Sequence, residues 1–421
     1  MGMHGINGGA VDSARIVDGT ITAADLASGV LGAQPCLRIG CIGDSISIGG
    51  VVATGTFSQN HYLPQTCFLL DGVIEWNSDW VWALTGYDFG EMITAGYHTT
   101  AAASVADIIV IHGGVNLPTG GFDGDVALAN VATMTETLLS AGKIVVLTSI
   151  GPTDEGYADA AWQLHRARFN SLVKAYAASM SNVYFCDFSA AWTDQTTDPT
   201  ALPTFTAALT DDGGPHPQED GYLAAAVKLA AVLSRLPNIG ASRRPDFSDL
   251  RYLSNVLMLG TDGATTSGED CGDLATGFAF VAGAAGTVAT KEARADGLNG
   301  IWQQYNVDTG DDDFLVRLAG LTLPVGTYNA FMEVEVHADA VANSATSARS
   351  YLIRIADSSG DVALARPEAA HMCAVTMAGK SGIWQLPFEI TNASNEFTIT
   401  HYPGRFDGIT KFGALWIEPR T

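Results

Sequence analysis

Ser45 lies where an apolar run, Leu37 to Ile42, ends abruptly in Gly43-Asp44-Ser45. A serine at such a junction could act as a nucleophile, because a buried parallel strand delivers its last residues to the sheet edge where open α/β folds bind ligands. Gly43 permits a sharp turn, and backbone N–H groups at the start of a following helix can stabilise an oxyanion. The alternative is an ordinary strand-to-loop turn, since Gly, Asp and Ser are common turn residues.

The stretch Cys41–Ile46 resembles the nucleophile block of the SGNH (GDSL-type) hydrolases, and three further stretches follow in the order of that family. His112–Asn116 follows the apolar run Ile108–Ile111 and is similar to the family's Gly-x-Asn block. Thr94–Thr99 resembles its glycine block. Thr210–Pro217 resembles the Asp-x-x-His-Pro segment that leads into the family's final helix.

The resemblance implies one chemical role in each stretch. Ser45 would be the nucleophile and His216 the general base. The Asn116 side chain and the backbone N–H of Gly96 would donate hydrogen bonds to the oxyanion, with Gly90 as the weaker candidate for the glycine. This chemistry needs no cofactor.

The last stretch departs from the family pattern. The family places its aspartate three residues before the histidine, where this chain has Gly213. Asp212 lies four residues before His216, and a Gly-Gly pair can absorb an inserted residue, so Asp212 is the predicted orienting carboxylate. The alternatives are a dyad between His216 and a backbone carbonyl, or a site that has lost its activity. Leu117, where the family often has Asp, and the displaced Asp212 slightly favour a domain that only recognises its ligand.

Residues 35–240 alternate strand and helix patterns, which predicts an α/β domain with a parallel sheet and helices on both faces. The resemblance implies the flavodoxin-like arrangement of the SGNH hydrolases. Strands are predicted at 37–42, 108–111, 144–147 and 183–185, and helices at 126–140, 159–178 and 221–236.

The pattern of apolar and turn residues changes in residues 241–421, after a linker near Pro237. Alternating apolar runs between turn residues predict an all-β domain, either a sandwich or a jelly roll. Such domains often bind carbohydrate through exposed aromatic rings, for which Trp302, Trp384 and Tyr402 are the candidates. The alternative for each of them is a place in the hydrophobic core.

Residues 1–34 carry an apolar-x-x-Gly-x-apolar pattern that recurs every ten residues, from Ile6, Ile16 and Leu26. So short a segment cannot bury its apolar residues within one chain, which predicts packing of three copies around one axis. The pattern resembles short repeats of trimeric phage tail fibres and spikes. The alternative is a flexible Gly-rich leader. The first residues do not resemble a secretory signal peptide.

The charge balance narrows the choice of partners. With 21 basic and 45 acidic residues the formal net charge is −24, and phosphate binding needs clustered Lys and Arg, so nucleic acid and anionic lipid are improbable partners. No segment approaches the ~18 to 20 apolar residues of a membrane helix, so no membrane insertion is expected. Six scattered cysteines predict neither a metal site nor a disulfide framework.

Together these patterns predict a serine esterase that forms a homotrimeric tail fibre or head spike. It would lie on the surface of a virion or phage-like particle, such as a gene transfer agent, and dock to other particle proteins. Its substrate would be the O-acetyl groups of bacterial capsule or O-antigen polysaccharide. The main alternative is a non-enzymatic receptor-binding spike protein whose degenerate SGNH domain recognises polysaccharide. A third is a free-standing secreted esterase, which the ten-residue repeat disfavours.

Overall fold

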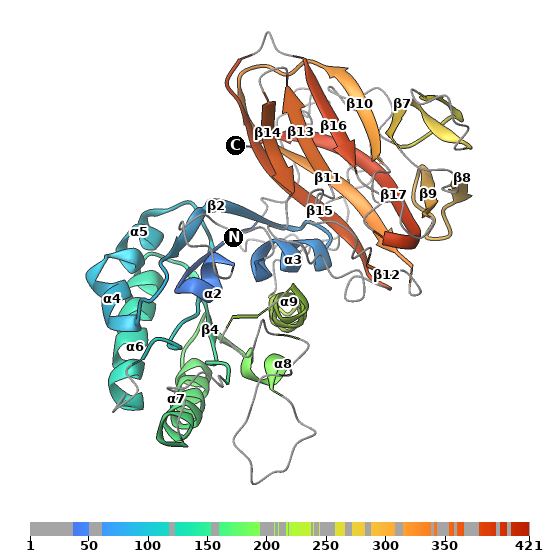
Figure 1. Ribbon diagram of the computed structural model, residues 1–421. Coiled ribbons are helices and arrows are strands. Elements are labelled where there is room, and N and C mark those ends of the chain that lie inside the picture. The colour runs from blue at the N-terminus through green and yellow to red at the C-terminus, as the bar shows by residue number, and fades with distance from the viewer. Residues whose placement is uncertain are drawn as a thin grey trace, which may run out of the picture. The chain divides into compact units, whose positions relative to one another are not determined.

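A five-stranded parallel sheet organises the first part of the chain that the structure describes (Figure 1). In spatial order its strands are β2 (Ile74–Ala83), β1 (Leu37–Gly43), β3 (Ile108–Ile111), β4 (Ile144–Thr148) and β5 (Val183–Cys186). Every residue of β3 is buried, as is expected of a strand covered by helices on both faces.

The structure is a computed structural model. It describes residues 37–49, 61–117, 123–152, 160–193, 206, 209, 216–217, 219–236, 239, 244, 257–265, 272–282, 288–307, 315–337, 341–342, 353–357, 360–365, 379–392, 396–401 and 406–420. The fibre-like segment predicted at residues 1–34 lies outside these ranges.

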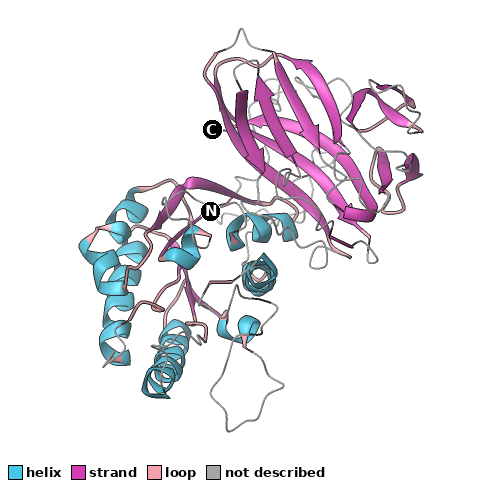
Figure 2. Cartoon of the chain, viewed as in Figure 1, coloured by secondary structure: helices cyan, strands magenta, loops and turns pink. Residues whose placement is uncertain are grey.

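Helices cover both faces of the sheet (Figure 2). Their bounds are α2 (Ser45–Ile48), α3 (Tyr62–Leu69), α4 (Phe89–Thr94), α5 (Tyr97–Ala103), α6 (Gly124–Ser140), α7 (Ala160–Ser179), α8 (Ser189–Trp192) and α9 (Glu219–Leu233). Because side chains alternate along a strand, Ile108 and Val110 pack in one cluster with α3, α8 and α9. Ile109 and Ile111 pack in a second cluster with α4, α5, α6 and α7.

The predicted α/β arrangement is confirmed. Each of the four predicted strands and three predicted helices is present, with ends that differ by at most three residues. Val126 of α6 is 58% exposed and does not belong to the buried face of this helix. The adjacent Ala127 takes the buried position, together with Val131, Met134 and Leu138.

Strand β2 was not predicted, because polar residues interrupt its apolar run. Ile39 of β1 pairs with Trp76, whereas Cys41 pairs with Val81, so β2 carries additional residues in a bulge. Gly40 of β1 accommodates this bulge, since a Cβ there would lie 2.5 Å from the carbonyl oxygen of Trp80.

The rest of the described chain forms two β-sheets. One has the order β14-β13-β16-β10-β7-β6, and the other β15-β11-β17-β9-β8 with β12 paired to β17. All pairings are antiparallel except β6 with β7. The bounds are β6 (Asp262–Thr265), β7 (Leu274–Ala282), β8 (Val288–Ala293), β9 (Ile301–Val307), β10 (Leu315–Leu321), β11 (Gly326–Val336), β12 (Val341–Ala342), β13 (Ile353–Asp357), β14 (Gly360–Ala365), β15 (Ser381–Ile390), β16 (Phe397–His401) and β17 (Phe406–Pro419).

Buried side chains of both antiparallel sheets belong to one hydrophobic cluster, which also includes residues of α3, β2 and α9. Leu37–Thr421 accordingly form one compact unit. The second part of the chain is β-rich, as predicted, whereas the sandwich or jelly-roll topology and the domain boundary at residue 240 stay predictions.

Candidate active site

The turn after β1 presents Ser45 as the first residue of α2. Asp44 caps this short helix, and its Oδ1 accepts a hydrogen bond from the Ile46 N–H at 3.0 Å. Gly43 is required sterically, because a Cβ there would collide with the Ser47 side chain and lie 2.5 Å from the His112 carbonyl oxygen. The turn therefore holds the serine tightly at the carboxyl end of a central strand.

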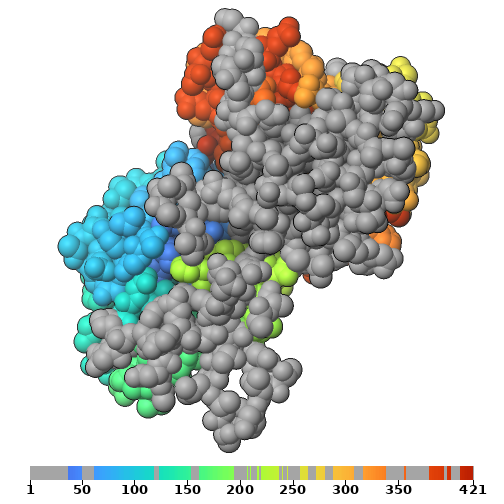
Figure 3. Space-filling view, in the orientation of Figure 1, coloured from blue at the N-terminus to red at the C-terminus, as the bar shows by residue number. Residues whose placement is uncertain are grey.

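His216 approaches Ser45 from a distant part of the sequence. Its Nε2 atom lies 2.8 Å from the Ser45 Oγ, although the two residues are 171 positions apart. His216 is half-buried and stands just before α9, whose described residues border those of the first strand and helices in the space-filling view (Figure 3). This distance is within the range that proton transfer between a nucleophile and a general base requires.

The predicted orienting carboxylate is not among the residues that the structure describes. Asp212 and Gly213 are both outside the described residues, so the assignment of Asp212 as the partner of His216 stays a prediction. Such a partner has a clear task, since His216 accepts a proton at Nε2 only if Nδ1 carries one.

Asn116 lies in the loop after β3, beside the nucleophile turn. The Val115 N–H, one residue before it, is close enough to the Asp44 carboxylate to lower the pKa of that group. The Asn116 Nδ2 donates to the carbonyl oxygen of Tyr87 at 3.2 Å, which ties the loop to the segment after β2. An amide group has two donor hydrogens, so one remains for an oxyanion while the other fixes the side chain.

The structure does not support Gly96 as an oxyanion donor. Its N–H donates to the Ile93 carbonyl oxygen at 2.9 Å, and its φ of 73° serves the turn between α4 and α5. Gly90 is better placed, because it lies in the first turn of α4, where backbone N–H groups have no acceptor within the helix. This turn follows Tyr87, the residue whose carbonyl oxygen binds Asn116.

Asp44 is a buried acid directly beside the nucleophile. Burial raises its pKa to about 7, although the N–H groups of Ile46, Ser47 and Val115 favour the charged form. Its Oδ2 atom has no hydrogen-bond partner among the described residues. Sequence reasoning missed the role of this residue, yet Asp directly before a helix is a recognisable capping signal.

His112 lies beneath the site, at the end of β3. Its Nδ1 is 2.7 Å from the Thr148 Oγ1, and that hydroxyl donates to the Ile111 carbonyl oxygen at 3.2 Å. The histidine therefore donates from Nδ1. Burial lowers its pKa to about 3, so it remains neutral near pH 7.

The prediction of exposed sugar-binding tryptophans is wrong for the two that the structure describes. Trp302 is only 9% exposed, and the Arg294 guanidinium carbon lies 4.3 Å from its ring centroid. Trp384 is only 4% exposed and packs against Phe68, with ring centroids 5.5 Å apart. Tyr402 lies outside the described residues.

Within the described ranges, no group of His, Cys, Asp and Glu side chains is arranged to hold a metal ion. Cys41, Cys67 and Cys186 are buried free thiols. None of the helices in the same ranges combines the length and apolar character that crossing a membrane demands.

A parallel sheet with a serine at the end of β1, and a histidine that reaches it from just before α9, is an arrangement typical of α/β serine hydrolases. Residues 41–224 match the model of the GDSL-like Lipase/Acylhydrolase family. The match supports the SGNH/GDSL hydrolase family for this part of the chain, in agreement with the resemblance in the sequence. No curated protein matches the chain.

Solved structures that are similar to this chain include two described as GDSL-type proteins and one described as a carbohydrate esterase. A member of the lipolytic protein G-D-S-L family from Veillonella parvula is 25% identical, with 48% of this chain and 100% of that chain covered and a TM-score of 0.34. A GDSL-like lipase from Bacteroides thetaiotaomicron is 18% identical, with 51% and 96% covered and a TM-score of 0.35. A carbohydrate esterase family 3 protein from Talaromyces cellulolyticus is 15% identical, with 46% and 95% covered and a TM-score of 0.34.

Proposed function

We propose that this protein is a serine esterase that hydrolyses carboxylic esters at Ser45. The 2.8 Å distance between the Ser45 Oγ and the His216 Nε2 carries the proposal, because a serine hydroxyl needs an adjacent base to become a nucleophile. The match of residues 41–224 to the GDSL-like Lipase/Acylhydrolase family supports the same chemistry.

The reaction proceeds in two halves. His216 takes the Ser45 proton as Oγ attacks the ester carbonyl, and it then protonates the leaving alcohol, which leaves an acyl-enzyme. Water attacks that intermediate with His216 again as base, releasing the acid and restoring the serine. In both halves the developing oxyanion is stabilised by the free N–H of the Asn116 side chain and by backbone N–H groups of Gly90 and Ser45.

The substrate we propose is an O-acetylated polysaccharide of the bacterial surface. The apolar-x-x-Gly-x-apolar repeat in residues 1–34 supports a trimeric tail fibre or head spike on a phage or phage-derived particle, where it would dock to other particle proteins. The net charge of −24 is compatible with a neutral or acylated glycan and unfavourable for polyanions.

The test compares the wild-type protein with Ser45→Ala in the release of acetate from p-nitrophenyl acetate and from O-acetylated capsule. Ser140→Ala is the matched control, because Ser140 is exposed at the far end of α6. We expect turnover in the wild type and the control, and a loss of about 10⁴-fold or more in Ser45→Ala.

The esterase proposal would be contradicted if the wild-type protein shows no turnover while it and Ser45→Ala bind polysaccharide equally well. That result would favour the second candidate, a receptor-binding spike with a degenerate hydrolase domain. Leu117, in place of the Asp that the family often has, is the observation that supports this candidate.

A further inference from the structure

Helix α3 lies between the nucleophile turn and the β-rich region. Its first residue, Tyr62, contacts α2, and Phe68 near its end contacts β15. Both side chains have 0% exposure, so neither contact can rearrange into solvent without opening the core. The helix therefore joins the two parts of the chain through buried contacts at each end.

The contact with the nucleophile turn is a side-chain hydrogen bond. The Tyr62 hydroxyl lies 3.2 Å from the Ser47 Oγ, and both groups are buried. Ser47 lies two residues after Ser45 in the same short helix and packs directly against Gly43. A shift of Tyr62 would therefore displace the four-residue helix that begins with Ser45.

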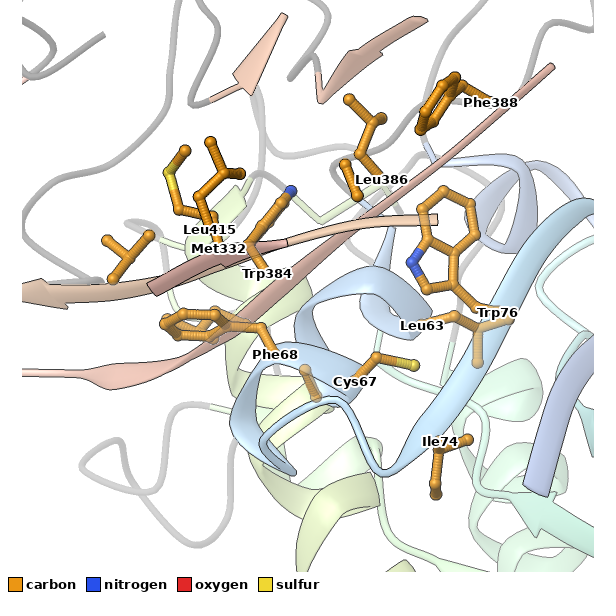
Figure 4. Packing of buried hydrophobic residues seen from close by; sticks show 14 of the residues in the cluster. Leu63, Cys67, Phe68, Ile74, Trp76, Met332, Trp384, Leu386, Phe388 and Leu415 are labelled. Atoms are coloured by element: carbon orange, nitrogen blue, oxygen red, sulfur yellow. The ribbon is translucent and has the colours of Figure 1, made fainter. Parts of the chain in front are cut away.

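The contact with the β-rich region is unusually close. A Cβ at Gly382 would collide with the Phe68 carbonyl oxygen, so the backbones of β15 and α3 meet where only glycine fits. Figure 4 shows Phe68 and Cys67 of α3 beside Trp384 of β15 within the shared cluster. Close packing of this kind transmits displacements, because protein interiors have few voids.

The same helix also contacts the element that follows the catalytic histidine. The Thr66 Oγ1 donates to the Tyr62 carbonyl oxygen at 2.7 Å and lies 3.5 Å from the Ala226 carbonyl oxygen in α9. The rings of His61, the N-cap of α3, and Tyr222 of α9 have centroids 6.2 Å apart. Helix α3 therefore contacts both α2, which begins with Ser45, and α9, which follows His216.

We propose that the β-rich region is a structural part of the hydrolase site, and that Trp384, Phe68 and Tyr62 are positioning residues for Ser45. Packing of Trp384 on Phe68 fixes α3, and the hydroxyl of Tyr62 then fixes Ser47 and the nucleophile turn. The effect on catalysis rests on the proposed esterase function, whereas the mechanical link does not.

The first test removes only the hydroxyl that joins the two helices. Tyr62→Phe should lower kcat on p-nitrophenyl acetate by about fivefold to tenfold, the scale of one hydrogen bond, and leave KM unchanged. The matched control is Tyr328→Phe, which removes a 2.8 Å hydrogen bond to the Pro324 carbonyl oxygen in the β-rich region. Equal kcat values for the two variants would overturn the role of Tyr62.

The second test removes the contact from the side of the β-rich region. Trp384→Ala should lower kcat by about tenfold at a temperature where the protein is folded, and Trp384→Phe should restore most of it because a ring still meets Phe68. Trp416→Ala is the control, since Trp416 is equally buried but belongs to a separate cluster with Phe331. We expect comparable falls in Tm for both alanine variants, and a loss of kcat only for Trp384→Ala.

Hydrogen exchange of the peptide covering residues 41–49, followed by mass spectrometry, separates this inference from the esterase proposal. Exchange there should rise in Trp384→Ala and stay at the wild-type level in Trp416→Ala. If both variants behave alike, the link through α3 is overturned, even in an active esterase. If exchange rises as expected but the wild type lacks turnover, the link stands and the esterase function fails.

Discussion

Two buried carboxylates, that of Asp44 at the nucleophile turn and that of Glu333 in the β-rich region, are held in different ways. Around the nucleophile turn, Asp44 and His112 are buried, and each has one polar atom without a hydrogen-bond partner among the described residues. Burial shifts their pKa values toward the neutral form, to about 7 for Asp44 and about 3 for His112. These groups are held in an environment that does not satisfy them fully.

In the β-rich region the buried carboxylate of Glu333 is surrounded by donors. Arg294 donates to it at 2.6 Å, and Arg244 forms an ion pair with it at 2.5 Å. The Ala414 N–H adds a third contact at 2.7 Å. The Glu333 carboxylate is thus paired, whereas the Asp44 carboxylate keeps one oxygen without a partner among the described residues, which is typical of groups that serve chemistry or its positioning.

The sharpest test of this contrast is to remove a group of the site and compare activity with stability. His216→Gln should lower kcat by about 10² to 10⁴-fold, because the general base is lost, while Tm changes little for a half-buried side chain. The measurements are esterase kinetics and thermal unfolding. His337→Gln, at a half-buried histidine of the β-rich region, should leave both unchanged. A large fall in Tm for His216→Gln would contradict the expectation that this residue serves activity rather than stability.

The opposite result is expected in the β-rich region. Glu333→Gln removes the carboxylate that pairs with two buried arginines and should lower the free energy of unfolding by about 3 to 5 kcal/mol, as measured by urea denaturation. Glu335→Gln is the control on the same strand, because its ion pair with Lys411 is partly exposed and should contribute at most about 1 kcal/mol. Similar losses for both variants would show that burial of Glu333 does not determine its importance.

Much of the α/β part could be predicted from the sequence because its signals are local. Apolar runs marked β1, β3, β4 and β5, and Gly-Asp-Ser marked the turn that bears Ser45. Strand β2 escaped prediction because Asn77, Ser78 and Asp79 lie in a bulge that only pairing with β1 explains.

The details that sequence could not provide depend on tertiary contacts. Thr94–Thr99 contains a glycine, but only the geometry shows that the Gly96 N–H is already bonded to Ile93. Aromatic residues near turns suggested sugar binding, yet Arg294 covers Trp302, and Phe68, from a distant part of the sequence, covers Trp384. The hydrogen bond between Tyr62 and Ser47 has no sequence signal at all.

The smallest expected effect concerns how Asp44 couples stability to pH. Its pKa is about 7 in the folded protein, above the ordinary value of 3.8 for an aspartate. Between these values the folded state holds a proton that the unfolded state has lost, so this group lowers stability as pH rises from about 4 to about 7. Above about pH 7 the cost is constant, and below about pH 4 it vanishes.

Asp44→Asn should remove this pH dependence, because the amide keeps an oxygen to cap α2 without a charge. We expect the difference in the free energy of unfolding, variant minus wild type, to increase by on the order of 2 to 4 kcal/mol as the pH rises from 4.5 to 8. Asp123→Asn is the matched control, since Asp123 caps α6 in the same manner but is exposed. If the two variants show the same pH dependence in urea titrations, burial does not shift the pKa of Asp44. The contrast between Asp44 and Glu333 would then rest on hydrogen bonding alone.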